Sequence, residues 1–78
     1  MAKILVVDDE ASIRKTLREI LEFEKFEVDE AGDGLDALAR IKQNDYDVVL
    51  LDIKMPKMDG MDALERLEIL KPDLPVIM

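Results

Sequence analysis

In the stretch VVLLDIKMPKMDG, residues 48–60, a run of four apolar residues ends abruptly on an aspartate. A buried carboxylate without a partner is costly, so Asp52 is expected either just outside a strand or present for its charge. The same pattern occurs near the N-terminus, where KILVVDDE, residues 3–10, also passes from apolar residues into acids. Two apolar strands that each end in carboxylates are therefore the feature on which the fold and the function depend.

Four segments have the composition of β-strands, namely residues 3–7, 26–31, 48–51 and 76–78. The first and third are short, rich in branched side chains and apolar on both faces, which is typical of strands in a parallel sheet covered on both sides. The second alternates like an edge strand, and it directs Phe26, Val28 and Glu30 to one side.

Helical periodicity fills the intervals between these strands. A helix is predicted over residues 11–24, with an apolar stripe formed by Ile13, Leu17, Ile20 and Leu21. The second helix has Asp33 as its candidate N-cap and carries Leu35, Leu38 and Ile41. The third has Asp59 as its candidate N-cap and carries Met61, Leu64 and Leu67. The segment KPDLP ends it, because a residue before proline disfavours the helical conformation.

Strands and helices thus alternate as βαβαβαβ in a single domain. This spacing predicts an α/β fold with a parallel sheet and right-handed crossovers, although the pattern does not give the strand order. Ligands of such open sheets bind at the carboxyl ends of the strands. Asp8, Asp9 and Asp52 all follow such ends, and they share one crevice if strands one and three are neighbours. A bound cation would then explain why the strands end in acids.

The composition restricts the ligand and the setting. The chain contains neither cysteine nor histidine, so a metal must be a hard cation held by oxygen. Nineteen acidic residues against eleven basic ones give a net charge of −8, a poor match to nucleic acid or to an anionic membrane. The apolar run at residues 4–7 is too short for a signal peptide or a membrane span, so a cytoplasmic setting is expected.

Simpler roles compete for the same residues. Acids near the start of a helix stabilise it, so Asp8, Asp9 and Glu10 would be ordinary helix caps if taken alone. Asp52 taken alone would be a polar residue that opens a loop. Three neighbouring carboxylates repel one another, however, and capping does not require them to gather. A cation site accounts for all of them together.

The segments ILVVDDE, AGDGLDAL, YDVVLLDIKMPKMDG and LPVIM resemble, in this order and spacing, the receiver domain of bacterial response regulators of the chemotaxis-regulator-like kind. The segments DLPVIM and DIKMPKMDG are most similar to receivers of enhancer-binding transcription activators. The resemblance implies a flavodoxin-like doubly wound parallel sheet with strand order 2-1-3-4. It also implies a phosphoprotein of two-component phosphorelay signal transduction with a part in transcription regulation.

The resemblance implies roles for named residues. Asp52 would be the phosphoacceptor for a sensor histidine kinase. The implied Mg²⁺ ligands are Asp8, Asp9, Asp52 and the backbone carbonyl of Lys54. The metal would offset the charge of a carboxylate that attacks a phosphoryl group. Pro56 and Gly60 would shape the loop beside the acceptor.

Receivers of this family have five strands and five helices, with a hydroxyl group after strand four and a lysine at the end of strand five. On this resemblance, residues 1–78 are the N-terminal two-thirds of a receiver domain, truncated after strand four. The metal half of the site is expected within these residues, and the phosphate-stabilising half beyond them. Such a fragment exposes apolar surface and a strand edge, so a homodimer or a swapped oligomer is expected. An output domain or an effector protein would carry the signal onward.

Two other classes of function remain. One is a non-phosphorylated interaction or scaffold fragment of the same fold, which labelling of Asp52 by an acyl phosphate would distinguish. The other is a Mg²⁺-dependent aspartyl phosphatase of the haloacid-dehalogenase type. Those enzymes need a second acid two residues after the nucleophile, where this chain has Lys54. The prediction is therefore a signalling module that is not an enzyme.

Overall fold

The structure is a computed structural model that describes residues 2–52, 65–66 and 69–77. Its elements in chain order are β1 (Lys3–Val7), α1 (Ala11–Phe23), β2 (Glu27–Ala31), α2 (Gly34–Gln43), β3 (Val48–Leu51) and β4 (Val76–Ile77). Residues 65–66 and 69–70 are also helical. The remainder of the predicted third helix, with Asp59, Met61, Leu64 and Leu67, lies outside the described residues.

The strands form one parallel sheet in the order β2-β1-β3-β4. β1 is central, and its Leu5 lies opposite Asp29 of β2 and Val49 of β3. Parallel strands require crossover connections. α1 connects the neighbours β1 and β2, and α2 connects β2 to β3, on the far side of β1. The predicted α/β class, flavodoxin-like with strand order 2-1-3-4, is confirmed.

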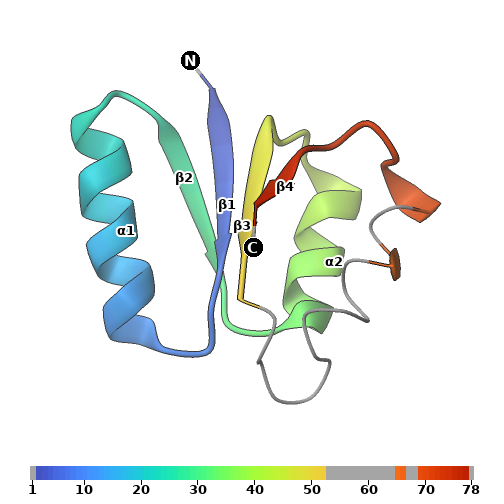
Figure 1. Ribbon diagram of the computed structural model, residues 1–78, viewed down its shortest axis with the longest axis horizontal. Coiled ribbons are helices and arrows are strands. Elements are labelled where there is room, and N and C mark those ends of the chain that lie inside the picture. Colours follow the sequence, from blue (N-terminus) through green and yellow to red (C-terminus); the bar gives the residue numbers. More distant parts are fainter. Residues whose placement is uncertain (1, 53–64, 67–68, 78) are drawn as a thin grey trace.

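The two helices cover opposite faces of the sheet, α1 on one side and α2 on the other (Figure 1). Side chains of β1 alternate between these faces. Leu5 and Val7 therefore join the apolar cluster beneath α2, whereas Ile4 and Val6 join the cluster beneath α1. Because β1 is buried on both faces from its second residue onward, the sequence after Lys3 is apolar.

Most of the predicted pattern of α2 is confirmed. The Asp33 carboxylate caps the helix by accepting a hydrogen bond, at 2.8 Å, from the backbone N–H three residues on. Of the three apolar residues predicted on this helix, Leu38 and Ile41 are buried, whereas Leu35 is 53% exposed. The buried stripe runs instead through positions 34, 37, 38 and 41, which recur every three or four residues and leave Leu35 at the margin.

The apolar stripe predicted for α1 is only partly buried. Its residues Leu17 and Leu21 pack on the sheet, whereas Ile13 is 41% and Ile20 is 56% exposed. The helix packs over β2 and β1, and two arginines on one of its flanks bind an acid of β2. The two isoleucines lie on the other flank of the same helix and stay open to solvent.

β2 begins at Glu27, one residue later than predicted. Phe26, Val28 and Glu30 do share the face toward α1, since the first two join its apolar cluster and the third binds its arginines. None of the described helices has the length and apolar character needed to cross a membrane.

Candidate functional site

The carboxyl ends of β1 and β3 lie side by side, because Val7 pairs with Leu51. Asp52, the first residue after β3, donates its backbone N–H to the Val7 carbonyl at 2.9 Å and extends the ladder by one residue. Asp8, the first residue after β1, donates its backbone N–H to the Ala31 carbonyl of β2 at 3.2 Å. The parallel register therefore brings Asp8 and Asp52 to the same edge of the sheet.

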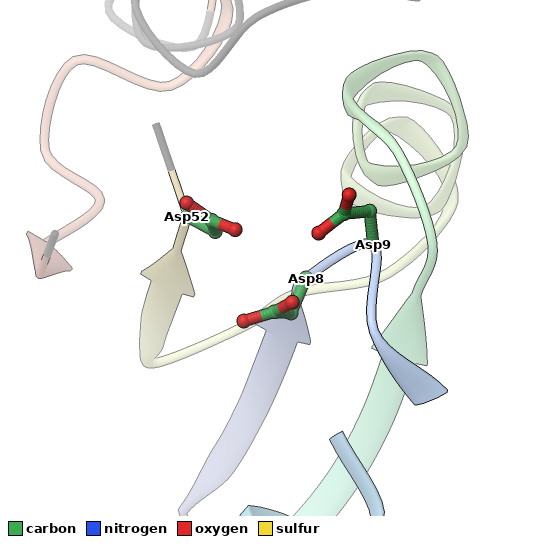
Figure 2. Close-up of side chains that lie close together, drawn as sticks. All are labelled: Asp8, Asp9 and Asp52. Atoms are coloured by element: carbon green, nitrogen blue, oxygen red, sulfur yellow. The ribbon is translucent and has the colours of Figure 1, made fainter. Parts of the chain in front are cut away.

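Three carboxylates converge at this edge. One oxygen from each of Asp8, Asp9 and Asp52 lies within 4.8 Å of the other two. Figure 2 shows Asp9 and Asp52 facing each other from the β1–α1 turn and the end of β3, with Asp8 at the end of β1. Asp8 and Asp52 are half-buried, whereas Asp9 is exposed. The structure thus brings together the three acids that the sequence places at strand ends.

Helix capping explains only part of this arrangement. The N-cap of α1 is Glu10, whose side chain makes no capping hydrogen bond, and the first turn of α1 holds no acid. Asp8 accepts the backbone N–H of Glu10 at 2.9 Å through one carboxylate oxygen, which orders the turn before the helix. By contrast, Asp33 caps α2 directly. Capping therefore does not require Asp9 and Asp52 to meet Asp8.

The donor set fits a hard divalent cation. Mg²⁺ prefers oxygen ligands at about 2.0–2.1 Å, so two oxygens on opposite sides of one ion are about 4.2 Å apart. Neighbouring ligands of an octahedral ion are closer, at about 3 Å, so the three carboxylate oxygens, which lie within 4.8 Å of one another, would have to draw together around a bound ion. The backbone carbonyl of Lys54, together with Pro56 and Gly60, lies outside the described residues.

Sequence reasoning missed a basic side chain that reaches this turn. Arg14 of α1 donates through Nη1 to the backbone carbonyl of Asp8 at 2.6 Å and through Nε to Glu30 at 3.2 Å. Arg18 also donates to Glu30, at 2.7 Å, and this bond, followed by the one from Arg14, holds the pKa of Glu30 below its ordinary value. The available signal was Glu30 itself, since an acid on the inward side of a strand needs a cation from the covering helix.

Residues 4–78 match the family model described as the response regulator receiver domain. The chain belongs to this family. It is therefore a receiver domain of the kind found in two-component systems, and the predicted recognition is confirmed at this level.

Named relatives agree with this assignment. The chain is 49% identical over 79 residues to protein-glutamate methylesterase/protein-glutamine glutaminase 3 of Rhodospirillum rubrum, covering 100% of the chain and 21% of that protein. It is 46% identical over 76 residues to transcriptional regulatory protein ResD of Bacillus subtilis, covering 97% of the chain and 31% of that protein. The receiver thus spans a third or less of these relatives, so the activities in their names are not carried over.

Solved structures share the fold closely. The response regulator TrrA of Thermotoga maritima, solved in complex with Mg²⁺–BeF, is 41% identical with a TM-score of 0.96, covering 100% of this receiver and 68% of that chain. TrrA has also been solved in complex with the histidine kinase ThkA, and that structure matches with a TM-score of 0.92 at 41% identity, covering 97% of this receiver and 66% of the other chain. The narrower likeness to enhancer-binding activators stays a prediction.

Proposed function

We propose that this receiver accepts a phosphoryl group on Asp52, with Mg²⁺ held by Asp8, Asp9, Asp52 and the backbone carbonyl of Lys54. The observation that carries the proposal is the convergence of three carboxylates at the carboxyl ends of β1 and β3. The Mg²⁺–BeF complex of TrrA supports the choice of metal. The domain assignment, residues 1–78 as the N-terminal two-thirds of a receiver, belongs to the same proposal.

The chemistry is an in-line displacement at phosphorus. A carboxylate oxygen of Asp52 forms a bond to phosphorus while the bond from phosphorus to a histidine nitrogen of the donor breaks. The nitrogen keeps the electron pair and takes up a proton, and Asp52 becomes an acyl phosphate. When bound, Mg²⁺ supplies positive charge that offsets the repulsion between the carboxylate and the phosphoryl oxygens. Asp8 and Asp9 hold that charge beside the acceptor.

The proposed donor is a sensor histidine kinase, as the complex of TrrA with ThkA supports. The proposed recipient of the signal is an output domain or an effector protein, since relatives such as ResD are longer than this receiver and are named as transcriptional regulators. The net charge of −8 disfavours direct contact with nucleic acid, so control of transcription would pass through that output part.

Titration with Mg²⁺ tests the metal site. Amide chemical shifts are a better probe than tyrosine fluorescence, because the single tyrosine, Tyr46, precedes β3 and the acids follow the carboxyl ends of the strands. We expect saturation in the parent chain, a strong loss of affinity in Asp9→Asn and Asp52→Asn, and no change in the matched control Asp73→Asn on the exposed loop before β4. Parent-like binding by the first two variants would place the metal elsewhere.

Labelling tests the phosphoacceptor. A small acyl-phosphate donor with Mg²⁺ should modify Asp52, and Asp52→Asn should abolish the modification. In a receiver extended to the full five strands the reaction should be faster, because each added donor to the phosphoryl oxygens can be worth about 3–4 kcal/mol. Mg²⁺ binding without labelling, even in the extended form, would favour the non-phosphorylated scaffold. The aspartyl phosphatase alternative is disfavoured, because it needs a second acid two residues after Asp52 and position 54 is a lysine.

We further propose that this 78-residue chain self-associates through the α1 side of the sheet. A hollow of about 320 Å³ lies there, and Val6, Leu17, Leu50 and Ile77 contribute to its lining. Ile77, in the edge strand β4, is 58% exposed, so both an apolar surface and a strand edge are open to a second copy.

Analytical ultracentrifugation over a range of concentrations tests the association. We expect the parent to sediment as a dimer at high concentration and Ile77→Asp to shift it toward monomer. Leu35→Asp is the matched control, because Leu35 is similarly exposed but belongs to α2 on the other face. A well-packed monomer at high concentration would contradict the proposal.

A further inference from the structure

The Arg14 side chain connects three parts of the fold. It projects from the second turn of α1, its Nε donates to Glu30 at 3.2 Å, and its Nη1 donates to the Asp8 carbonyl at 2.6 Å. The guanidinium also lies close to the β2–α2 turn, since a methyl group on Gly32 would be 3.6 Å from Nη1. Only 20% of the side chain is exposed. An enclosed guanidinium with two acceptors on separate segments is fixed in direction.

The contact with the Asp8 carbonyl controls one particular peptide group. That carbonyl belongs to the planar unit that joins Asp8 to Asp9, so its direction fixes the position of the Asp9 Cα and limits where the Asp9 side chain can reach. The peptide on the other side of Asp8 is held as well, because the Asp8 N–H donates to Ala31 of β2 at 3.2 Å. Asp8 is thus fixed through both of its peptide groups, from β2 and from α1.

We infer that Arg14 is a positioning residue that orients the Asp8–Asp9 peptide and so directs Asp9 toward Asp8 and Asp52 for the divalent cation. This inference rests on the proposed function. The positive charge of Arg14 does not oppose a metal, because it is paired with Glu30 on β2. Arg14 therefore acts on the metal site through the direction of the Asp8 carbonyl and not through its own charge.

Lysine is expected to replace arginine only in part. The planar guanidinium presents Nε and Nη1 in fixed directions, which suits two acceptors on different elements. A lysine ammonium at position 14 would keep the positive charge. Its flexible chain would not hold hydrogen bonds to Glu30 and to the Asp8 carbonyl in fixed directions, as the guanidinium does. Arg14→Lys is therefore expected to retain much of the stability from the ion pair and to lose part of the orientation of Asp9.

Arg18 offers a matched control within the same helix. It lies one turn further along α1, and like Arg14 it donates to Glu30, in its case through Nη1 at 2.7 Å. Its Nε donates to the Glu22 side chain at 3.3 Å. Removal of either arginine takes one bond from Glu30, and Arg14 is the one that contacts the turn carrying Asp9. A difference between the two variants in metal binding therefore isolates the carbonyl contact.

The experiment compares Mg²⁺ affinity, followed by amide shifts, in the parent, Arg14→Gln, Arg14→Lys, Arg18→Gln and Asp9→Asn. Loss of an outer-shell partner of a metal ligand commonly weakens binding by about 10–100-fold. We expect a loss of about tenfold in Arg14→Gln, a smaller loss in Arg14→Lys, and less than about twofold in Arg18→Gln. Without metal, amide hydrogen exchange at Asp9 and Glu10 should accelerate in Arg14→Gln and not in Arg18→Gln.

Each outcome has a definite meaning. If Asp9→Asn loses binding while both Arg14 variants bind like the parent, the positioning role is refuted and the proposed function stands. Equal losses in Arg14→Gln and Arg18→Gln would also refute it, because helix anchoring alone would explain them. If Asp9→Asn and Asp52→Asn bind like the parent, the proposed function fails and the inference fails with it. Should Arg14→Gln not fold, Arg14→Lys decides the matter by the same criteria.

Discussion

The two ends of the sheet use their acidic residues in opposite ways. Toward the amino ends of the strands, Asp47, just before β3, accepts the backbone N–H of Lys3 at 2.6 Å, and Asp29, at the middle of β2, accepts a hydrogen bond from the Tyr46 hydroxyl at 2.7 Å. At the carboxyl ends, the three carboxylates of the candidate site converge on one another within 4.8 Å. The acids at the first end join separate segments of the chain. Those at the second end form a set that suits a cation.

The amino-end contacts form a small network around Tyr46. The Lys3 ammonium lies 3.7 Å from the Asp29 carboxylate and 5.2 Å from the centroid of the Tyr46 ring. Burial raises the pKa of the Tyr46 hydroxyl, and the hydrogen bond to Asp29 raises it further. Both effects favour the neutral tyrosine in the folded chain, so this end of the sheet is expected to contribute to stability with no ligand present.

The largest expected effect is stabilisation by Mg²⁺ through the carboxyl-end acids. At a free Mg²⁺ concentration of 100 times Kd, binding to the folded state alone adds about 2.7 kcal/mol to the free energy of unfolding. Urea denaturation with and without the metal measures it. Asp9→Asn should lose most of this gain and Tyr46→Phe should keep it. An equal gain in all three chains would mean that the two ends do not differ in the way we describe.

The next effect concerns the amino end. Tyr46→Phe removes the donor to the half-buried Asp29, and it should lower the free energy of unfolding by about 1–2 kcal/mol in the absence of metal. Because folding raises the pKa of Tyr46, this stability is complete below the unfolded value of about 10 and is lost as the pH rises further. The difference between parent and variant should therefore shrink at strongly alkaline pH. If Tyr46→Phe leaves the free energy of unfolding unchanged, the network has no structural role.

A smaller effect of opposite sign is expected at the carboxyl end. Without metal, Asp9→Ala relieves repulsion between neighbouring carboxylates, which amounts to at most about 1 kcal/mol for exposed charges some 4 Å apart in water. The free energy of unfolding should rise in the metal-free chain, and the advantage should disappear when Mg²⁺ is added. Destabilisation of the metal-free chain by Asp9→Ala would instead make Asp9 a structural cap, and the contrast between the two ends would fail.

Much of this comparison could be predicted from the sequence. The apolar runs that end at Asp8 and Asp52 predict parallel strands with acids at their carboxyl ends, because strand composition and helical periodicity are local properties. The resemblance to receivers supplied the strand order, which no local pattern contains. The convergence of the acids followed from that order, and the structure places them together. Their role as metal ligands and acceptor stays a prediction.

The features that were missed depend on tertiary contacts. The exposure of Ile13 and Ile20 follows from where α1 lies on the sheet, and helical periodicity does not give that position. Arg14 is a charged residue that local patterns assign to solvent, yet it meets Glu30 because α1 lies against β2. Lys25 adopts a positive φ of 73° after α1, where glycine is the usual signal and the sequence has none.

The smallest effect is expected for Glu30, an acid that does not fit the contrast between the two ends of the sheet. Glu30 is near the carboxyl end of β2, but it is paired with Arg18 and Arg14 in the way that the amino-end acids are paired. Folding lowers the pKa of Glu30, first through the hydrogen bond from Arg18, so its contribution is complete above the ordinary value of 4.5 and is lost as the pH falls below it.

Glu30→Gln should therefore lower the free energy of unfolding near pH 7 by less than about 1 kcal/mol, because the ion pairs are partly exposed. Thermal denaturation of the parent and the variant between pH 7 and pH 3 measures the difference, which should shrink toward zero at the acid end. The matched control is Asp36→Asn, because Asp36 pairs with Arg40 on the surface of α2, away from both ends of this comparison. A difference that persists at pH 3 would mean that Glu30 acts by packing, and that pairing with cations is confined to the amino end.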